Sequence, residues 1–511
     1  MSTPKLTTFS KVLITLVVMG IIGFILYKVT RNTEIKDKIT NLGKKETPQG
    51  YNEVINIGVV TWGGYAGGQY FNNGFKPNPG SNFRKEYGFD VNFEVIDDFD
   101  ASREAFKNGK IDLLWATIDA LPTEMEGLEQ YDPQVVFQAD WSRGGDAVVV
   151  RRGINSVADL KGKKVAVAPM TPSHSFLLWL LEAGDLKLKD VKVVEVPSAI
   201  DAADAFKSNT VDAAVVWSPD DADCVSKVPG SRVLESTKNA SHIIADVFIA
   251  KKSFIQEHKN QLQDLYEGWM KGAADLNKGD DNKMIAAKIL AEGLNQPEDF
   301  CLQAINNVRL ATHGDNKDFF GLNRDYTGVT GEQLYNKMKS KYQEVGYNTA
   351  KARSWRLLAS DIVNNVELTG SDHNSEAGKV FTSEQGSESN KEAISTKKVS
   401  ISFRTGEFML DDNAKQIIDL QFTDIAKAFS NAKVRIEGNT DNVGSRETNI
   451  MLSKKRAQSV ADYLIQTHKM PKERFIIIGN GPDNPVQGCE NNDTDACKSK
   501  NRRTDFELIP D

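Results

Sequence analysis

A phrase that occurs twice is the strongest constraint on the fold of this chain. Residues 105–112 read Ala-Phe-Lys-Asn-Gly-Lys-Ile-Asp, and residues 205–212 read Ala-Phe-Lys-Ser-Asn-Thr-Val-Asp. In each copy, a helix is expected to end in a turn that leads into strand residues and a tryptophan, Trp115 or Trp217. Two lobes built on one plan would produce this repetition.

Strand-like and helix-like segments alternate around this repeat from residue 53 to residue 366. The predicted strands are short apolar runs at 54–60, 91–96, 111–115, 146–151, 164–168, 191–196 and 211–216. Strands that alternate with helices are typical of parallel α/β sheets. The sequence therefore predicts an α/β fold with enough strands for two lobes.

The length and charge of the chain bound its functions. A chain of 511 residues can form two or three domains, each with a sizeable core. Its formal net charge of −7, without a notable basic patch, argues against nucleic acid as a partner.

The N-terminal region carries an uninterrupted, essentially apolar run at residues 12–27. A helix of this length spans about 24 Å, which is short for a bilayer core of about 30 Å. The flanking Lys11 and Lys28 can extend to the interface and make up the difference. A cleaved signal peptide is the alternative, but no small-x-small cleavage site follows the run. We expect a cytoplasmic segment, an uncleaved transmembrane anchor and a polar tether, at residues 1–11, 12–28 and 29–52.

Near the C-terminus, a carboxylate and a guanidinium lie fifteen residues apart around one expected strand–loop–helix turn. Residues 434–438 alternate like a strand, and residues 446–467 have helical periodicity. Asp441 precedes the helix, while Asn449 and Arg456 share one helix face. Because Asp441 can hold an ammonium and Arg456 can bind a carboxylate in a bidentate arrangement, the pair suits a zwitterionic ligand.

The same run resembles the OmpA-like peptidoglycan-binding domain. The family pattern is roughly T-D-x-x-G, then N-x-x-L-S-x-x-R-A, then N-R-R, and all three pieces occur in order at residues 440–444, 449–457 and 501–503. In that family the aspartate and the arginine hold the diaminopimelate of the cell-wall stem peptide. The resemblance covers residues 398–511 and implies a small α+β domain that binds peptidoglycan through Asp441 and Arg456, with Asn449 as a helper.

The four cysteines give a hint about the compartment. Cys489 and Cys497 bracket a polar loop with no third or fourth soft ligand nearby, which makes a metal site a poor explanation. A disulfide is favoured, and a similar bridge occurs in some OmpA-like domains. Such a bridge implies an oxidising compartment such as the periplasm. Whether Cys224 pairs with Cys301 stays open.

Four motif pieces of the α/β region lie at residues 144–150, 154–167, 171–175 and 211–219. Together they resemble the periplasmic solute-binding proteins of the nitrate, sulfonate and thiamine-precursor type, which serve ABC transporters. The resemblance covers residues 53–366. It implies two α/β lobes joined by a hinge that close on a small solute.

Ligands in such α/β folds bind at the carboxyl ends of strands. This rule nominates residues that follow strands or begin a helix, namely Trp62, Tyr65, Thr117, Asp119, Thr171, Ser173, Ser175, Trp217, Asp220 and Asp246. A helix start with hydroxyl groups suits an anion or a carbonyl, whereas acids beside tryptophans suit an amine or quaternary ammonium. The two interpretations agree only for a zwitterion. Core packing of the tryptophans and plain helix capping by Thr171 and Ser173 are the alternatives.

Signatures of enzymes are missing from the sequence. The six histidines include no metal-ligand pair at helical spacing, and no phosphate-binding glycine loop is present. We therefore expect no catalytic residues, no cofactor and no metal.

The order of these segments predicts a function in the cell envelope. Residues 367–397, rich in Gly, Ser and Glu, are expected to form a flexible linker. We expect a single-pass inner-membrane protein of a Gram-negative-type bacterium, with most of the chain in the periplasm. It would bind peptidoglycan and capture an unknown small solute for an inner-membrane transporter or receptor. The alternative is a structural membrane-to-wall tether whose α/β region binds a protein partner.

Overall fold

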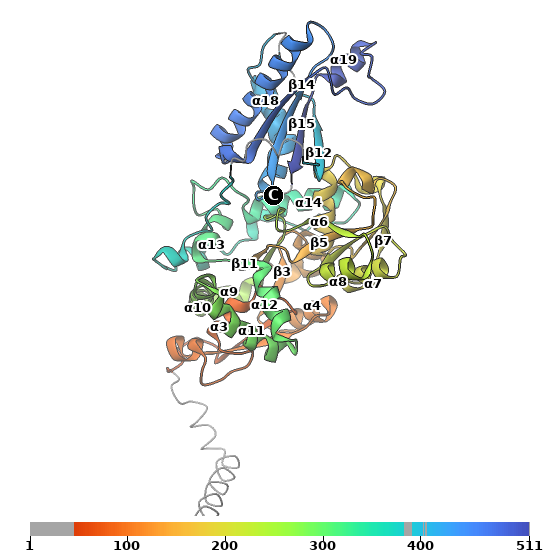
Figure 1. Ribbon diagram of the computed structural model, residues 1–511. Helices are drawn as coiled ribbons and strands as arrows, with labels where there is room; N and C mark the ends of the chain where they lie inside the picture. The colour runs from red at the N-terminus through yellow and green to blue at the C-terminus, as the bar shows by residue number, and fades with distance from the viewer. Residues whose placement is uncertain (1–44, 383–390, 402, 404–405, 510–511) are drawn as a thin grey trace, which may run out of the picture.

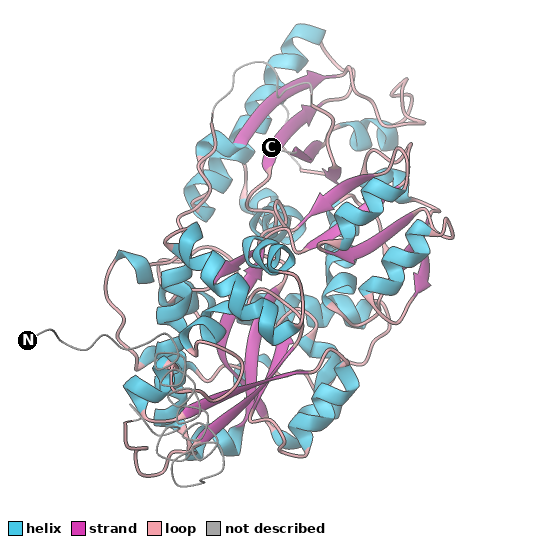
Figure 2. Cartoon of the chain, turned by 60° about the horizontal axis from the view of Figure 1, so that its bottom comes forward, coloured by secondary structure: helices cyan, strands magenta, loops and turns pink. Residues whose placement is uncertain are grey.

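Three sheets organise the chain in the computed structural model, which describes residues 45–382, 391–401, 403 and 406–509. Two sheets belong to the α/β region and the third belongs to the C-terminal domain, which lies at one end of the molecule (Figure 1). Helices flank the strands of all three sheets (Figure 2).

The first lobe is built on a six-stranded sheet in the order β11-β4-β10-β3-β1-β2. Its strands are β1 (Val54–Val59), β2 (Asp90–Val95), β3 (Leu113–Thr117), β4 (Pro133–Ser142), β10 (Ala245–Lys251) and β11 (Val308–Leu310). Its helices are α3 (Ala66–Phe71), α4 (Phe99–Lys107), α5 (Leu121–Leu128), α9 (Lys252–Glu257), α10 (Lys259–Asn277), α11 (Asp280–Leu294), α12 (Glu298–Asn306), α13 (His313–Phe319), α14 (Gly331–Glu344) and α15 (Ser360–Asn364). β1 is parallel to β2 and β3, whereas β10 is antiparallel to β3 and β4.

The second lobe is built on a five-stranded sheet in the order β7-β6-β8-β5-β9. Its strands are β5 (Asp146–Val150), β6 (Lys164–Val167), β7 (Lys192–Glu195), β8 (Ala213–Trp217) and β9 (Arg232–Ser236), and its helices are α6 (Pro172–Ala183), α7 (Ala199–Lys207) and α8 (Asp220–Lys227). β5 is antiparallel to β8 and to β9. The expectation of parallel sheets was therefore wrong in part, because an antiparallel strand enters each sheet where the chain changes lobe.

The repeated phrase marks equivalent positions in the two lobes. It ends α4 in the first lobe and α7 in the second, and each helix leads into a strand parallel to a central neighbour. The aspartate at the end of each phrase accepts a hydrogen bond from the backbone of a neighbouring strand. Asp112 accepts a hydrogen bond from the backbone N–H of Asn56 at 2.8 Å, and Asp212 accepts one from Lys164 at 2.8 Å.

The chain crosses between the lobes twice. The first crossing joins β4 to β5 at residues 142–146, and the second joins β9 to β10 at residues 236–245. The first lobe thus contains chain from before the first crossing and after the second. We call the junction of the two lobes beside these crossings the crease.

The C-terminal domain has a four-stranded sheet in the order β12-β15-β13-β14. Its strands are β12 (Ser395–Val399), β13 (Lys433–Asn439), β14 (Phe475–Gly481) and β15 (Thr504–Ile509), and its helices are α16 (Asp412–Ile418), α17 (Asp424–Ala428), α18 (Arg446–His468) and α19 (Asp495–Asn501). The long helix α18 packs against β13 and β14. Its buried face includes Asn449, Arg456, Ala457, Val460 and Leu464, as the helical spacing predicts.

Described parts of the predicted linker 367–397 pack against the protein. Glu376 pairs with Arg143 at 2.7 Å, and Phe381 is buried. β12 begins at Ser395, and the backbone N–H of Val157 donates to the carbonyl of Ile394 at 2.8 Å. Composition alone does not reveal these contacts, because one buried aromatic side chain or one ion pair is enough to hold a polar segment against the protein.

Membrane anchoring is a separate question, because the predicted anchor at residues 12–28 lies outside the described residues. Among residues 45–509, with the gaps given above, no helix combines the length and apolar character needed to cross a membrane.

The buried ion pair between Arg84 and Asp90 stabilises the first lobe. The two Asp90 carboxylate oxygens accept bonds from Arg84 Nε at 2.6 Å and Nη2 at 2.7 Å. We expect Asp90→Ala to lower the free energy of unfolding by about 3–5 kcal/mol, because the buried guanidinium loses its bidentate partner. Lys76→Ala, which breaks the exposed Lys76–Glu94 pair, should cost no more than about 1 kcal/mol. Urea unfolding of both variants checks this, and equal effects would contradict it.

Candidate functional site

Acidic and aromatic side chains from both lobes meet at the crease. Asp246 on β10 lies opposite Thr117 on β3 and opposite Asp140 on β4, so the three residues are neighbours across the sheet of the first lobe. From the second lobe, Asp146 at the start of β5 lies opposite Trp217 at the end of β8. The crease thus joins the carboxyl ends of β3 and β8, where ligands of α/β folds bind.

Three of these acids accept hydrogen bonds from neutral donors. Trp62 Nε1 donates to Asp140 Oδ2 at 2.8 Å, and the Tyr65 hydroxyl donates to Asp246 Oδ2 at 2.6 Å. On the other side, the Ser142 hydroxyl donates to Asp146 Oδ2 at 2.7 Å.

A fourth acid, Asp119, lies two residues beyond the end of β3 and is fully buried. Neither of its carboxylate oxygens has a hydrogen-bond partner among the described residues. The Ser175 hydroxyl, which bonds the Tyr342 hydroxyl at 2.8 Å, lies close enough to Asp119 to oppose the rise of its pKa. A buried carboxyl without a partner is costly, which makes Asp119 a candidate for contact with a ligand.

Burial governs the titration of all four acids. Loss of solvent raises the pKa of Asp119 to about 8 and the pKa values of Asp140 and Asp146 to about 7. The pKa of Asp246 is also raised, first by burial and then by the charge of Asp140. Carboxyls in this environment resist ionisation unless a cation accompanies them.

Two glycines allow the close packing of these groups. A Cβ atom at Gly64 would lie 1.2 Å from Asp140 Oδ2, and one at Gly145 would lie 2.1 Å from the Trp62 ring. Only glycine leaves room for the carboxylate and the indole at these two points.

The structure brings together most of the predicted solute-site residues. Trp62, Tyr65, Thr117, Asp119 and Asp246 share the crease with Ser175 and Trp217 from the second lobe. Their role in binding stays a prediction.

Among the residues that the structure describes, the other three predicted residues form no hydrogen bond or ion pair with the acids of the crease. Asp220 begins α8, and the charges that act on it come from α7 and α8, chiefly Lys207 and Asp223. The Thr171 hydroxyl donates to the carbonyl of Ala168 at 2.9 Å, a local turn contact. Ser173 is fully buried at the start of α6, and its hydroxyl has no partner in the described part of the chain.

The sequence analysis did not nominate Asp140, Ser142 or Asp146. Asp146 stood within the motif at residues 144–150, and Asp140 precedes Trp141. Because strand pairing, rather than sequence spacing, places Asp140 beside Asp246, no local pattern could reveal it.

The C-terminal domain contains a second candidate site, at the N-terminal half of α18. A cavity of about 210 Å³ is lined there by Phe403, Asn439, Arg456 and Arg502, among others. The Arg456 guanidinium lies 4.8 Å from the centre of the Phe403 ring, and its Nε donates to the carbonyl of Glu407 at 3.0 Å. Burial lowers the pKa of Arg456, while the charge of Asp441 opposes that shift.

Asp441 has a partner that the sequence analysis did not assign. Arg502 Nη1 donates to Asp441 Oδ2 at 2.6 Å, and the backbone N–H of Val443 donates to Oδ1 at 3.1 Å. Asn449 Nδ2 donates to the carbonyl of Val443 at 3.0 Å and so fixes the loop that carries Asp441. Asp441, Asn449 and Arg456 therefore occupy one neighbourhood, and Arg502 belongs to it.

The predicted disulfide between Cys489 and Cys497 is present. Asn501 Nδ2 donates to the carbonyl of Cys489 at 2.9 Å, which links the bridged loop to the sheet that follows. Cys224 and Cys301 are free, buried thiols and do not pair with each other.

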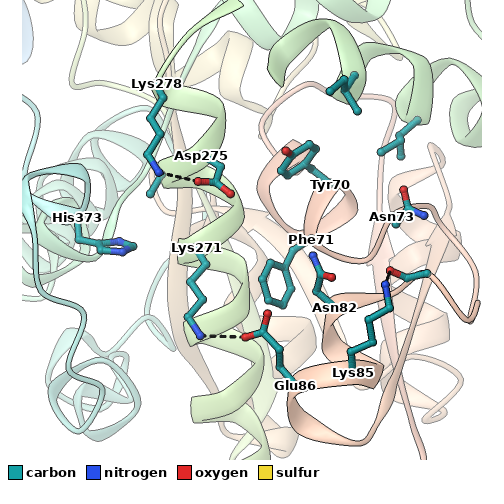
Figure 3. Close-up of a pocket in the computed structure, with 14 residues that line it drawn as sticks. Tyr70, Phe71, Asn73, Asn82, Lys85, Glu86, Lys271, Asp275, Lys278 and His373 are labelled. Carbon is teal, nitrogen blue, oxygen red and sulfur yellow. Dashed lines mark hydrogen bonds and ion pairs between the residues drawn. The ribbon is translucent and has the colours of Figure 1, made fainter. Parts of the chain in front are cut away.

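A further pocket, of about 580 Å³, opens on the first lobe between α3, α10 and α11 (Figure 3). Four of its charged groups form two ion pairs, Lys271 with Glu86 at 3.1 Å and Lys278 with Asp275 at 2.8 Å, and Lys85 Nζ donates to the carbonyl of Gly80 at 2.8 Å. None of the predicted solute-site residues lines it, so it does not compete with the crease as the candidate site.

The acids of the crease should make the stability of the unliganded protein depend on pH. A carboxyl with a raised pKa stabilises the fold below its unfolded pKa of about 4, and that contribution is lost as pH rises through the folded value. Buried His174, with its pKa lowered to about 4, acts in the opposite direction and matters mainly below pH of about 7. We expect urea unfolding to show falling stability from pH of about 7 to 8.5 and a flatter profile in Asp119→Asn. Equal slopes in wild type, Asp119→Asn and the exposed control Asp100→Asn would contradict this.

Comparison with known proteins identifies two segments of the chain. Residues 80–291 match the NMT1-like family, and residues 402–502 match the OmpA family. Neither match is to a family of enzymes.

Named relatives fall into the same two groups. The taurine-binding periplasmic protein of Escherichia coli K12 is 27% identical over 180 residues, which are 34% of this chain and 54% of the relative. The peptidoglycan-associated lipoprotein of Rhizobium meliloti is 35% identical over 103 residues, which are 20% of this chain and 56% of the relative. The chain spans between 37% and 56% of the length of the curated relatives it matches. The crystal structure of the periplasmic aliphatic sulphonate-binding protein of Escherichia coli aligns with a TM-score of 0.48 at 18% identity, covering 61% of this chain and all of that protein.

The relatives with descriptive names are periplasmic, outer-membrane or peptidoglycan-associated proteins. This chain combines a segment similar to the NMT1-like family with a C-terminal segment similar to the OmpA family, and the two matches support an envelope-associated protein.

Proposed function

We propose that this protein captures a small solute between its two lobes while its C-terminal domain holds it on peptidoglycan. The observation that carries the proposal is that groups from both lobes line one crease, directly beside the two crossings of the chain. Rotation about these crossings would open the crease for a solute, and closure would bury the solute against both lobes. Solute binding and lobe closure would then be one event.

The resemblance of the first domain to solute-binding proteins supports a proposal about the solute and its acceptor. A relative of this region is named a taurine-binding periplasmic protein, so a small polar solute is a reasonable cargo here too. We propose delivery to an inner-membrane transporter or receptor, with residues 12–28 as an anchor in that membrane. The anchor would keep the lobes close to the acceptor.

For the wall-binding site we propose the diaminopimelate of the stem peptide as ligand. Arg456 is buried in the wall of the cavity and can bind a carboxylate there, and Asp441 can bind the neighbouring ammonium. Arg502 occupies Asp441 in this structure, but its side chain is 46% exposed and can move aside. The ligand ammonium would then take the place of the Arg502 guanidinium beside Asp441.

Peptidoglycan binding should depend on both charged groups. We expect Asp441→Ala and Arg456→Ala each to weaken sedimentation with purified sacculi by about 10- to 100-fold, because each removes charge-assisted bonds worth about 1.5–3 kcal/mol. Lys454→Ala is the matched control, because Lys454 is exposed on the same helix and two residues, about 200°, away from Arg456.

The sedimentation assay also separates the two sites. Undiminished binding by both variants would refute the assignment of the wall site and leave solute capture untouched. If the variants lose sacculi while no solute is ever bound, the protein is instead a tether whose α/β region binds a protein partner.

A further inference from the structure

We propose that the crease takes an organic cation, either a small amine or quaternary ammonium or the ammonium end of a zwitterion. The proposal rests on the solute-binding function above and specifies its chemistry. It sets this chain apart from a binder of simple anions such as a sulfonate without an amine.

The first argument is the sign of the charge. Asp119, Asp140 and Asp246 from the first lobe meet Asp146 from the second, and each is at least nine-tenths buried. Asp119 experiences the charges of Asp246 and Asp146, and Asp246 experiences those of Asp140 and Asp146. Four like charges in a site shielded from water repel each other strongly unless protons or cations offset them.

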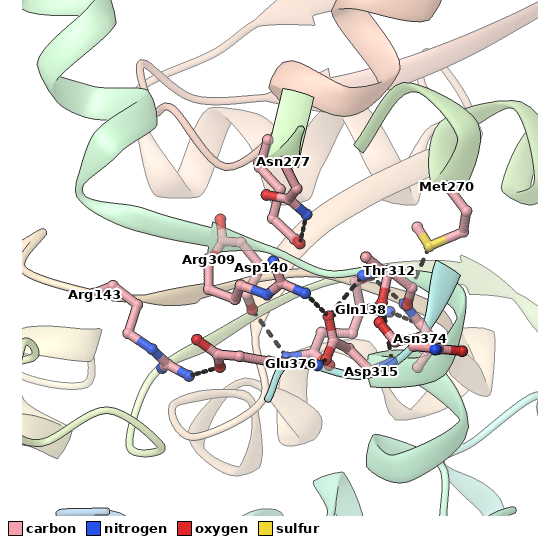
Figure 4. Close-up of polar contacts among 12 residues, drawn as sticks. Gln138, Asp140, Arg143, Met270, Asn277, Arg309, Thr312, Asp315, Asn374 and Glu376 are labelled. Atoms are coloured by element: carbon pink, nitrogen blue, oxygen red, sulfur yellow. Dashed lines mark hydrogen bonds and ion pairs between the residues drawn. The ribbon is translucent and has the colours of Figure 1, made fainter. Parts of the chain in front are cut away.

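Two nearby cations each pair with a carboxylate outside the crease. The charge of Arg143 acts on Asp140, and Arg143 Nη2 binds Glu376 at 2.7 Å (Figure 4), whereas its Nε and Nη1 have no partner among the described residues. Arg103 acts on Tyr65 and is bound to Glu124 through Nε at 2.6 Å and Nη2 at 2.8 Å. Within the described residues, the hydrogen bonds to the carboxylates of Asp140, Asp246 and Asp146 come from an indole, a tyrosine hydroxyl and a serine hydroxyl.

The second, independent argument is unused hydrogen-bonding capacity. Both oxygens of Asp119 and Oδ1 of Asp140 are buried and have no partner in the described chain. A primary ammonium offers three donors and would satisfy these oxygens while neutralising the charge, whereas a quaternary ammonium would supply the charge alone. A buried acceptor that is already desolvated gives the full benefit of such a bond to the ligand.

The aromatic side chains fit the same ligand. Trp62 and Tyr65 are hydrogen-bonded to the acids themselves, and Trp217 lies opposite Asp146. Aromatic faces beside carboxylates are the usual surroundings of an amine or quaternary ammonium. A metal ion is a poorer fit, because the described residues contain no His, Cys, Asp and Glu group arranged to hold one.

A zwitterion could place its anionic end at the start of α6. That helix has twelve residues, and the buried Ser173 hydroxyl in its first turn has no partner among the described residues. Ser175 lies two residues after Ser173, and its hydroxyl acts on the pKa of Asp119, so the start of α6 lies near that acid. The ammonium end would still contribute most of the affinity, because the site has more acids than groups that can bind an anion.

The test is isothermal titration of the full-length chain with small probes of matched size. Tetramethylammonium and ethylammonium carry only the cation, taurine carries both charges, and ethanesulfonate carries only the anion. We expect the ammonium probes or taurine to bind at least tenfold tighter than ethanesulfonate. Tighter binding of ethanesulfonate would overturn the cation assignment and leave solute capture standing. No binding of any ammonium probe at millimolar concentration would also overturn it.

Substitutions locate the binding. Asp140→Asn and Asp246→Asn keep the shape of the side chain and remove its charge, and each should weaken ammonium binding at least tenfold. The exposed Asp100→Asn is the control and should bind as wild type does. Unchanged binding in folded Asp140→Asn and Asp246→Asn would overturn the proposal.

A measurement on the wild-type chain guards against a variant that fails to fold. Tetramethylammonium has no titratable proton, so any pH dependence of its binding comes from the protein. Tyr65 and Tyr342, which face the acids, have pKa values raised well above the usual range and stay neutral. Affinity should therefore rise from pH of about 6 to 8 as the acids ionise. A flat profile would contradict the proposal.

Discussion

The burial of four carboxylates at the junction of two lobes is the interaction on which the rest of this structure depends. The acids are brought together by strand pairing in the first lobe and by the strand that opens the second. Their burial raises their pKa values, so the folded chain retains protons that the unfolded chain would lose. A ligand that offsets the charge is the best explanation of such a costly cluster at the junction of the lobes.

Much of the fold could be predicted from the sequence because its signals are local. The repeated phrase located α4 with β3 and α7 with β8, and the helical spacing located α18 to within one residue. β4 and β10 escaped prediction. β4 buries Gln138 and Asp140, and Gln138 is stabilised by Asn316, 178 residues away, whose Oδ1 accepts from its backbone N–H at 2.8 Å. Polar residues buried through distant partners cannot be recognised by periodicity, and Asp140 was missed for that reason.

The C-terminal domain contacts the second crossing between the two lobes. The backbone N–H of His242, in the second crossing, donates to the carbonyl of Ala428 at 3.0 Å, and Ser241 bonds Ser430 at 2.7 Å. The first crossing is contacted by Glu376 through Arg143. The segment predicted to be a flexible linker thus contributes to the contact between the domains. The flexibility of a segment can be predicted from its composition, but its contacts in the folded protein depend on residues that are distant in the sequence.

A native mass spectrum of the full-length chain, purified without added ligand, tests the central claim most directly. The account predicts a small adduct that carries an amine, present in the wild-type protein and absent from Asp246→Asn. An adduct without a basic group, or an adduct that persists in Asp246→Asn, would contradict the account. A wild-type spectrum at the mass of the chain alone would contradict it as well.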